Sequence, residues 1–398
     1  MALLQIEEAH PSSPLTGCAL WRLGFRPFYW MAACLALVAI PVWLLQYQGI
    51  LSPWAGLSGL EWHVHELIFG YAVAVIAGFL LTAAQNWTGQ PMPTGRSLMA
   101  LAALWLAGRV LLPFAPLILS APVDLAFLPL LAWTLHQRLR LTANRRNDFA
   151  PRLLVGMALL NLGFYLGHAG WWPVSPLLPL IATLYLIVTL EVIIAGRIVP
   201  MFTRNALPGV RQYRIDWIER IIAPLTALIL LTDLSPLQGR GLAALNFALA
   251  VLHLVRWTGW APFATWRKPL LWILHLSYLW MALGIALAGF AVLNTVSWVA
   301  VFHLLGIGAT GGLTLGMLTR TALGHTGRVL KAATTETLAY SAIALAALLR
   351  IAPVLLPLPG GMAGWLWAAA ACWCAAFILY LSKYSAILFR TRVDGKPG

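Results

Sequence analysis

The sequence predicts an all-α polytopic membrane protein with about twelve transmembrane helices. Its 398 residues are 61% hydrophobic and only 10% charged, whereas a soluble domain carries about 25% charged residues. Apolar runs of the length that a bilayer requires, about 20 residues, recur along the whole chain. The net charge of +14 comes from short basic clusters between these runs, a pattern that orients membrane proteins. We therefore expect a lipid bilayer as the partner and no nucleic acid.

The apolar runs, taken in chain order, define the expected helices. The N-terminal stretch before them is polar, acidic and proline-containing, without the basic start and apolar core of a cleavable signal peptide. We expect a cytoplasmic tail at 1–19, one transmembrane domain at 20–390 and a cytoplasmic tail at 391–398. The expected helices are 20–46, 64–85, 97–119, 122–141, 152–172, 177–203, 217–234, 240–258, 269–291, 295–320, 335–357 and 362–389.

The basic residues between the runs predict the orientation in the membrane. Of the 26 Lys and Arg residues, all but Arg109, Arg240 and Arg350 fall in loops or helix ends on the same side. The positive-inside rule makes this side cytoplasmic, together with both termini. An even number of helices leads to the same result, since both ends of the chain must then lie on one side.

A short motif at the inner ends of three helices indicates an internal repeat. T-R-x-A-L occurs at 203–207 and again at 319–323, and the second helix ends with Thr82 without the arginine. Aligning the three threonines spaces the helices by about four, and internal repeats are common in membrane folds. The alignment predicts three four-helix units at roughly 20–141, 152–258 and 269–389; chance recurrence of a short boundary motif is the alternative.

The segment W-H-V-H-E at 62–66 places two imidazoles at the outer end of the second helix. Residues two apart on an α-helix point about 200° apart, so His63 and His65 would serve two different centres. If the helix end is unwound, both would reach one centre. Ionisable residues within a membrane usually face a cavity, a cofactor or each other. Glu66 and Glu191 are accordingly candidate catalytic groups that relay protons; for Glu191 a structural pair with Arg197 is the alternative.

Single histidines on separate helices within an apolar bundle favour haem as the cofactor, because each axial position takes one imidazole. His303 lies at a depth similar to that of the histidine pair and is its natural partner. We expect one or two b-type haems, with Gly308 and Gly312 giving room for the porphyrin. The alternative for these glycines is ordinary close packing of helices through small residues.

Copper is a second candidate cofactor, and it usually takes three neutral imidazoles. The candidate copper ligands are His168 and His275 together with one of the pair His63 and His65, whereas His303 is a candidate ligand of the haem iron. His168 also suits an interfacial position beside the tryptophans that follow it. His275 could equally donate a hydrogen bond between helices.

Several blocks of the sequence resemble the NnrS family of bacterial membrane proteins. The resemblance implies a haem- and copper-containing protein of the bacterial inner membrane, associated with nitric oxide and with resistance to nitrosative stress. Among the histidines, His168 alone of the candidate ligands lies outside the matching blocks; His325 lies within them. The blocks are LGFRPFYW (23–30), WHVHELIFGYAVAVIAGFLLTAAQNWTG (62–89), GRIVPMFTRNALPG (196–209), LHLSYLW (274–280) and HLLGIGATGGLTLGMLTRTALGHTGR (303–328).

The twelve-helix pattern is also similar in architecture to the haem–copper oxidase core. The similarity stops at the ligands, because helices 6 and 7 of this chain carry no histidine and the H-x-H pair lies on helix 2. Architecture alone does not imply function.

The resemblance and the histidines together predict a membrane haem protein that binds or detoxifies nitric oxide. Reduction of nitric oxide would make it an oxidoreductase and would need electrons from a quinol or a redox protein. A non-enzymatic transporter or a metal or haem carrier is the alternative. Transporters usually contain helices broken near the membrane midplane, whereas the prolines here lie mainly at helix ends.

Overall fold

The computed structural model describes residues 18–54, 56–142, 147–237, 239–359 and 361–396. These residues form helices and no strand, which confirms the all-α prediction. Most of the expected N-terminal tail lies outside the described residues. The α-helices are α1 Phe25–Tyr47, α2 Gly59–His65, α3 Val73–Thr88, α4 Gly95–Phe114, α5 Leu117–Leu139, α6 Phe149–His168, α7 Leu177–Ala206, α8 Asp216–Thr232, α9 Arg240–Thr258, α10 Pro269–Val292, α11 Trp298–His303, α12 Gly312–His325, α13 Thr334–Leu355 and α14 Gly361–Phe389.

Eleven helical spans in the described part of the chain are long and apolar enough to cross a membrane. The protein is therefore a multi-pass membrane protein. The twelfth expected helix is also present, as α8, but it has only 17 residues and begins with Asp216 and Glu219 in its first turn. Its polar first turn shortens the apolar stretch that the sequence offers there.

Two of the spans contain a π-helical segment near the end that holds the candidate histidines. The span Gly59–Thr88 consists of α2, the π segment η2 at Glu66–Ala72, and α3. The span Trp298–His325 consists of α11, the π segment η5 at Leu304–Gly311, and α12. Such segments are rare and often mark functional sites. We call the end of the bundle where α2 and α11 begin the outer end, following the predicted orientation.

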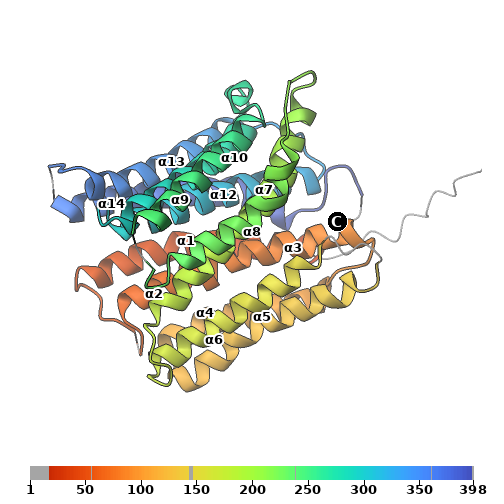
Figure 1. The fold of residues 1–398 in the computed structure, drawn as a ribbon. Helices are drawn as coiled ribbons and strands as arrows, with labels where there is room; N and C mark the ends of the chain where they lie inside the picture. The colour runs from red at the N-terminus through yellow and green to blue at the C-terminus, as the bar shows by residue number, and fades with distance from the viewer. Residues whose placement is uncertain (1–17, 55, 143–146, 238, 360, 397–398) are drawn as a thin grey trace, which may run out of the picture.

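The helices pack into one bundle in which the first helix, α1, lies against the last, α14 (Figure 1). In this view α4, α5 and α6 form one side of the bundle, and α9, α10, α13 and α14 form the opposite side. The helices α1, α3 and α7 run between these groups. The first helix packs on the last, α14, so the bundle closes.

The described chain ends lie together at the inner end. Arg26 donates hydrogen bonds to the carbonyl oxygens of Leu388 at 2.7 Å and Arg390 at 2.9 Å. The amide of Val393 donates to the carbonyl of Thr326 at 3.2 Å. Placement of both ends on one side agrees with an even number of crossings. That this side is cytoplasmic stays a prediction.

The three threonines that define the predicted repeat share one hydrogen-bond pattern, and two of their spans contain a π segment. Thr82, Thr203 and Thr319 are all buried, and each donates its hydroxyl to the carbonyl four residues earlier. The offset that aligns Thr82 with Thr319 carries Glu66–Ala72 onto residues 303–309, close to the second π segment at Leu304–Gly311. The threefold repeat itself stays a prediction.

Candidate functional site

A cavity of about 760 Å³ opens between the outer ends of several helices. Its wall combines residues of α1, the α2–η2 span, α7, the α11–η5 span, α13 and α14, so it is assembled from both halves of the chain. Most lining residues are apolar. The basic side chains among the lining residues are His63, His303 and Arg350, and none of these residues is Asp or Glu.

His63 enters the cavity from α2. The helix begins at a capping box in which Ser58 and Glu61 bond each other's backbone amides at 3.2 Å and 2.8 Å, and it is regular through His65. The imidazole stacks on the Trp43 ring with centroids 4.2 Å apart and planes at 23°. Its buried Nδ1 atom has no hydrogen-bond partner among the described residues. The ring is therefore held by its stack on Trp43 without a hydrogen bond at Nδ1.

His303 enters the same cavity from the last turn of α11. Its Nδ1–H group donates a hydrogen bond to the carbonyl of Val299 at 2.7 Å. Since a neutral imidazole carries one proton, this bond leaves Nε2 with a free lone pair. A backbone carbonyl bonded to the far nitrogen is the usual way in which proteins orient a metal-binding histidine.

The glycines of the span Trp298–His325 divide between the cavity and a helix interface. Gly306 lines the cavity, and a Cβ atom there would meet nothing within 4 Å. A Cβ atom at Gly308 would lie 2.9 Å from Trp280 of α10, and one at Gly312 would collide with Ser277 of α10. Gly308 and Gly312 thus let two helices approach, which was the packing alternative, and Gly306 is the glycine that leaves room in the cavity.

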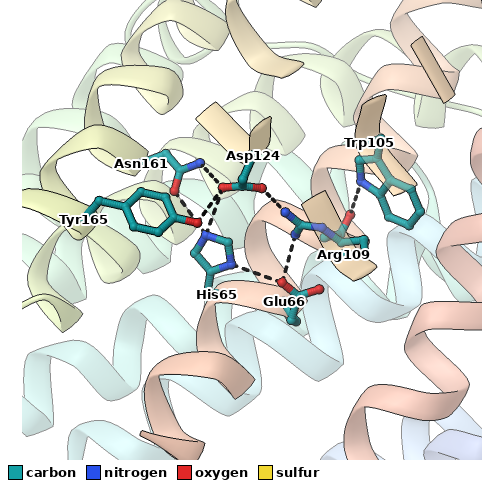
Figure 2. A network of polar contacts seen from close by, with 8 residues as sticks. His65, Glu66, Trp105, Arg109, Asp124, Asn161 and Tyr165 are labelled. Carbon is teal, nitrogen blue, oxygen red and sulfur yellow. Dashed lines mark hydrogen bonds and ion pairs between the residues drawn. The ribbon is translucent and has the colours of Figure 1, made fainter. Parts of the chain in front are cut away.

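His65 points away from the cavity into a buried network of polar side chains (Figure 2). Its Nδ1 lies 3.2 Å from the Glu66 carboxylate, and its Nε2 lies 3.1 Å from the amide oxygen of Asn161 and 3.3 Å from Asp124. Arg109 bridges the two carboxylates, at 3.0 Å from Glu66 and in direct contact with Asp124. The network joins α2, η2, α4, α5 and α6.

The remaining contacts of the network close it around Asp124. The amide of Asn161 donates to the Asp124 carboxylate at 2.7 Å, and the Tyr165 hydroxyl donates to it at 3.1 Å. Arg109 also lies 5.9 Å from the centre of the Trp105 ring, whose indole N–H donates to the Gly70 carbonyl. Every charged group of the network thus has an opposite charge or a hydrogen-bond partner, as buried charges require.

The network occupies both nitrogens of His65. Nε2 faces the oxygen atoms of Asn161 and Asp124, and Nδ1 faces the Glu66 carboxylate. Both ring nitrogens therefore have partners within the network, and neither faces a space that could hold a metal. The predicted cofactor role of His65 therefore has no support in this geometry. His63 and His65 lie in different environments on a regular helix, and the helix end is not unwound.

Glu191 lies deeper in the bundle, beside a second cavity of about 70 Å³. Its carboxylate accepts a hydrogen bond from the Thr310 hydroxyl at 3.2 Å, and Thr310 also lines the main cavity. Arg197 donates instead to Asn147 at 2.8 Å. The structural pair between Glu191 and Arg197 is therefore not formed, and Thr310 connects Glu191 with the main cavity.

His168 and His275, two of the histidines considered for copper, do not line the cavity that contains His63 and His303. His168 at the end of α6 lies 3.2 Å from Glu61, and His275 bonds the Thr203 hydroxyl at 2.9 Å. His325 lies beside Phe25, with ring centroids 5.7 Å apart. Within the described ranges, no three His, Cys, Asp or Glu side chains form a group suited to a metal ion.

Comparison with known proteins places the chain in a family. The NnrS protein family model matches residues 19–392, nearly the whole chain. The chain belongs to the NnrS family. No curated protein matches the sequence. Family membership and the helical membrane fold fit a membrane protein linked to the nitric oxide response.

Three charged residues of this NnrS-family chain were missed as site residues by the sequence prediction. Arg109 and Asp124 belong to the network of His65, and Arg350 lines the main cavity. The sequence did contain a signal for the two arginines, because Arg109 and Arg350 are two of the three basic residues outside the clusters that are predicted to be cytoplasmic. Asp124 lies inside an expected span, where a carboxylate needs a partner.

Proposed function

We propose that this NnrS-family protein holds a b-type haem in its main cavity and binds nitric oxide there, in the inner membrane of a bacterium exposed to nitrosative stress. The observation that carries the proposal is the pair His63 and His303, two imidazoles from distant spans that face one apolar cavity. Haem, when bound, supplies an iron atom that coordinates nitric oxide.

The cavity suits such a cofactor in size and character. Its volume of about 760 Å³ lies within the range of small-molecule and cofactor sites, about 300–1,000 Å³. Its wall is mainly apolar, and Gly306 leaves space beside His303. An apolar wall excludes water from the gas and from the metal, so it favours binding of a small uncharged ligand.

The imidazoles of His303 and His63 differ in whether Nδ1 has a hydrogen-bond partner, and this difference suggests different roles. The hydrogen bond from Nδ1 of His303 to the Val299 carbonyl orients the ring. It also makes the Nε2 lone pair of His303 more basic, and hence a stronger metal ligand than that of a ring without such a bond. His63 has no such bond at its buried Nδ1. We therefore assign His303 as the permanent ligand and His63 as the ligand that gives way to the gas.

Reduction of the gas would need a proton supply as well as electrons. Two nitric oxide molecules, two electrons and two protons give nitrous oxide and water, with the electrons from a quinol or a redox protein. Glu191 is better placed than Glu66 to deliver protons, since its partner Thr310 lines the cavity. Glu66 is held by Arg109 and His65.

Spectroscopy of the purified protein tests the proposal. Protein expressed with an ample haem supply should show a Soret band, a b-type pyridine haemochrome and a shift of the Soret band on addition of nitric oxide. A colourless preparation under these conditions would exclude a bound haem and favour a transporter that holds none. The variant Glu191→Gln should keep the band and the shift, and should lower nitric oxide consumption by roughly a hundredfold if Glu191 relays protons.

A further inference from the structure

Arg350 lies in the wall of the main cavity, and no described residue supplies a counter-ion for it. It lies on α13, about one and a half turns before the helix ends at Leu355. The guanidinium atoms Nε and Nη1 are buried and have no hydrogen-bond partner among the described residues. Arg350 forms no ion pair there either, whereas the buried Arg109 and Arg256 each face carboxylates.

The surroundings of Arg350 offer no anion. It lines both the main cavity and an adjoining pocket of about 50 Å³, and both also contain His63 and His303. The described residues around these two spaces include no Asp or Glu. A buried charge normally has a partner, so the missing partner points to a ligand that brings its own negative charge.

We propose that Arg350 binds a carboxylate of the ligand in the main cavity, namely a propionate side chain of the porphyrin; this inference rests on the proposed function. The planar guanidinium matches a carboxylate with two parallel hydrogen bonds, from Nη2 together with either Nε or Nη1. Each of these two pairs includes an atom without a hydrogen-bond partner among the described residues. With the imidazoles of His63 and His303 directed at the metal, a carboxylate held by Arg350 would set the rotation of the porphyrin within the cavity.

The experiment compares haem with its dimethyl ester, which has the same ring and iron but no carboxylates. Full-length haem-free protein, purified from cells grown without a haem supply, is titrated with each compound and followed at the Soret band. The variants are Arg350→Met, which keeps an apolar stem of similar length, and Arg350→Lys, which keeps the charge. Arg240→Met is the matched control, because Arg240 is exposed at the start of α9, outside the cavity lining.

The proposal predicts how tightly each variant binds haem and its dimethyl ester. Wild-type protein and Arg240→Met should bind haem about tenfold or more tightly than the ester, the effect of a charged hydrogen bond. Arg350→Met should bind both compounds with equal affinity, close to that of wild type for the ester, and Arg350→Lys should recover part of the preference. An unchanged preference for haem in Arg350→Met would overturn the assignment of Arg350 while leaving haem binding intact. Absence of any Soret band in wild type would overturn the proposed function itself.

Thermal stability gives a second measurement that guards against misfolding of the variant. Without haem, Arg350→Met should melt at a higher temperature than wild type, since it removes an uncompensated buried charge. Haem should raise the melting temperature of wild type more than that of the variant. A lower melting temperature of haem-free Arg350→Met than of haem-free wild type would contradict the absence of a counter-ion.

A lipid phosphate is the other anion that Arg350 could bind, and vesicles of phosphatidylglycerol test it. If these vesicles compete with haem for wild type but not for Arg350→Met, the anion is a lipid phosphate and the propionate assignment is overturned.

Discussion

The Nε2 atom of His65 lies 3.1 Å from the amide oxygen of Asn161, on the side of α2 that faces α6 rather than the cavity. His63, two residues earlier, stacks on Trp43 of α1 and lines the cavity. One helical turn thus carries a histidine free to bind a ligand and a histidine held in a polar network. The two should respond differently to substitution.

Substitution of His65 should affect stability and leave the spectrum of the proposed haem unchanged. His65→Ala removes one partner from a buried charged network, which costs about 3–5 kcal/mol. The melting temperature should fall clearly, while the Soret band of the folded fraction stays as in wild type. His168→Ala is the control, because His168 is partly exposed and pairs with Glu61 alone, so its loss should cost about 1 kcal/mol or less. A changed haem spectrum in His65→Ala would show that His65 contacts the cofactor.

Substitution of the two cavity histidines should give two different spectra. His303→Ala should lose most of its haem, because the better oriented ligand is gone. His63→Ala should retain haem, change from six-coordinate low spin to five-coordinate high spin, and bind nitric oxide faster. Haem content by pyridine haemochrome, optical and electron paramagnetic resonance spectra, and stopped-flow mixing measure these properties. Equal haem loss in both variants would argue that both imidazoles are permanent ligands.

Two neighbouring glycines should separate cavity volume from helix packing. Gly306→Leu would project a side chain into open space in the cavity, so the protein should fold and lose haem affinity. Gly308→Leu would meet Trp280, 2.9 Å from a Cβ atom, and such overpacking typically costs about 1–3 kcal/mol. Size-exclusion profiles, melting temperatures and haem titrations distinguish the two effects. Normal haem affinity in Gly306→Leu would mean that the cofactor does not use this part of the cavity.

Asp233, after the end of α8, should make stability depend on pH. Burial raises its pKa from 3.8 to about 6, although a hydrogen bond from Asn246 at 2.8 Å acts in the opposite direction. The folded state therefore keeps a proton that the unfolded state loses near pH 4. The contribution of Asp233 is most favourable below about pH 4 and is lost as the pH rises to about 6.

The variant Asp233→Asn isolates this contribution, because the amide stays neutral at every pH. Its melting temperature should exceed that of wild type by more at pH 7.5 than at pH 4.5. The difference between the two proteins cancels the titration of all other groups. An equal difference at both pH values would show that Asp233 titrates normally in the folded protein.

Composition and hydropathy predicted the helical membrane fold well, because bilayer thickness dictates the length of each span. The helix limits agree closely at α9, predicted as 240–258 and observed as Arg240–Thr258. The division of His63 and His65 between two sides of the helix followed from the helical period alone. The position of both π segments could not be predicted, since no residue type encodes them.

The partners of each side chain were harder to predict than its depth. Depth follows from the distance along one helix, whereas the contact of Asp124 with His65 depends on how α5 packs against α2 and α6. The roles of the glycines were equally hard to predict from their spacing. Gly306 faces open space and Gly308 faces Trp280, and the sequence does not show this difference. Three-dimensional packing decides these contacts, and one sequence contains no direct record of it.

The π segment at Glu66–Ala72 has a consequence for how such a protein can change. A π turn holds one residue more than an α turn, so loss of a single residue there would convert it to regular helix. Everything before the deletion, His63 included, would turn by about 100° relative to α3. A one-residue deletion could therefore redirect the His63 imidazole without replacing the histidine. The direction of a metal-binding side chain can thus evolve separately from the type of residue that provides it.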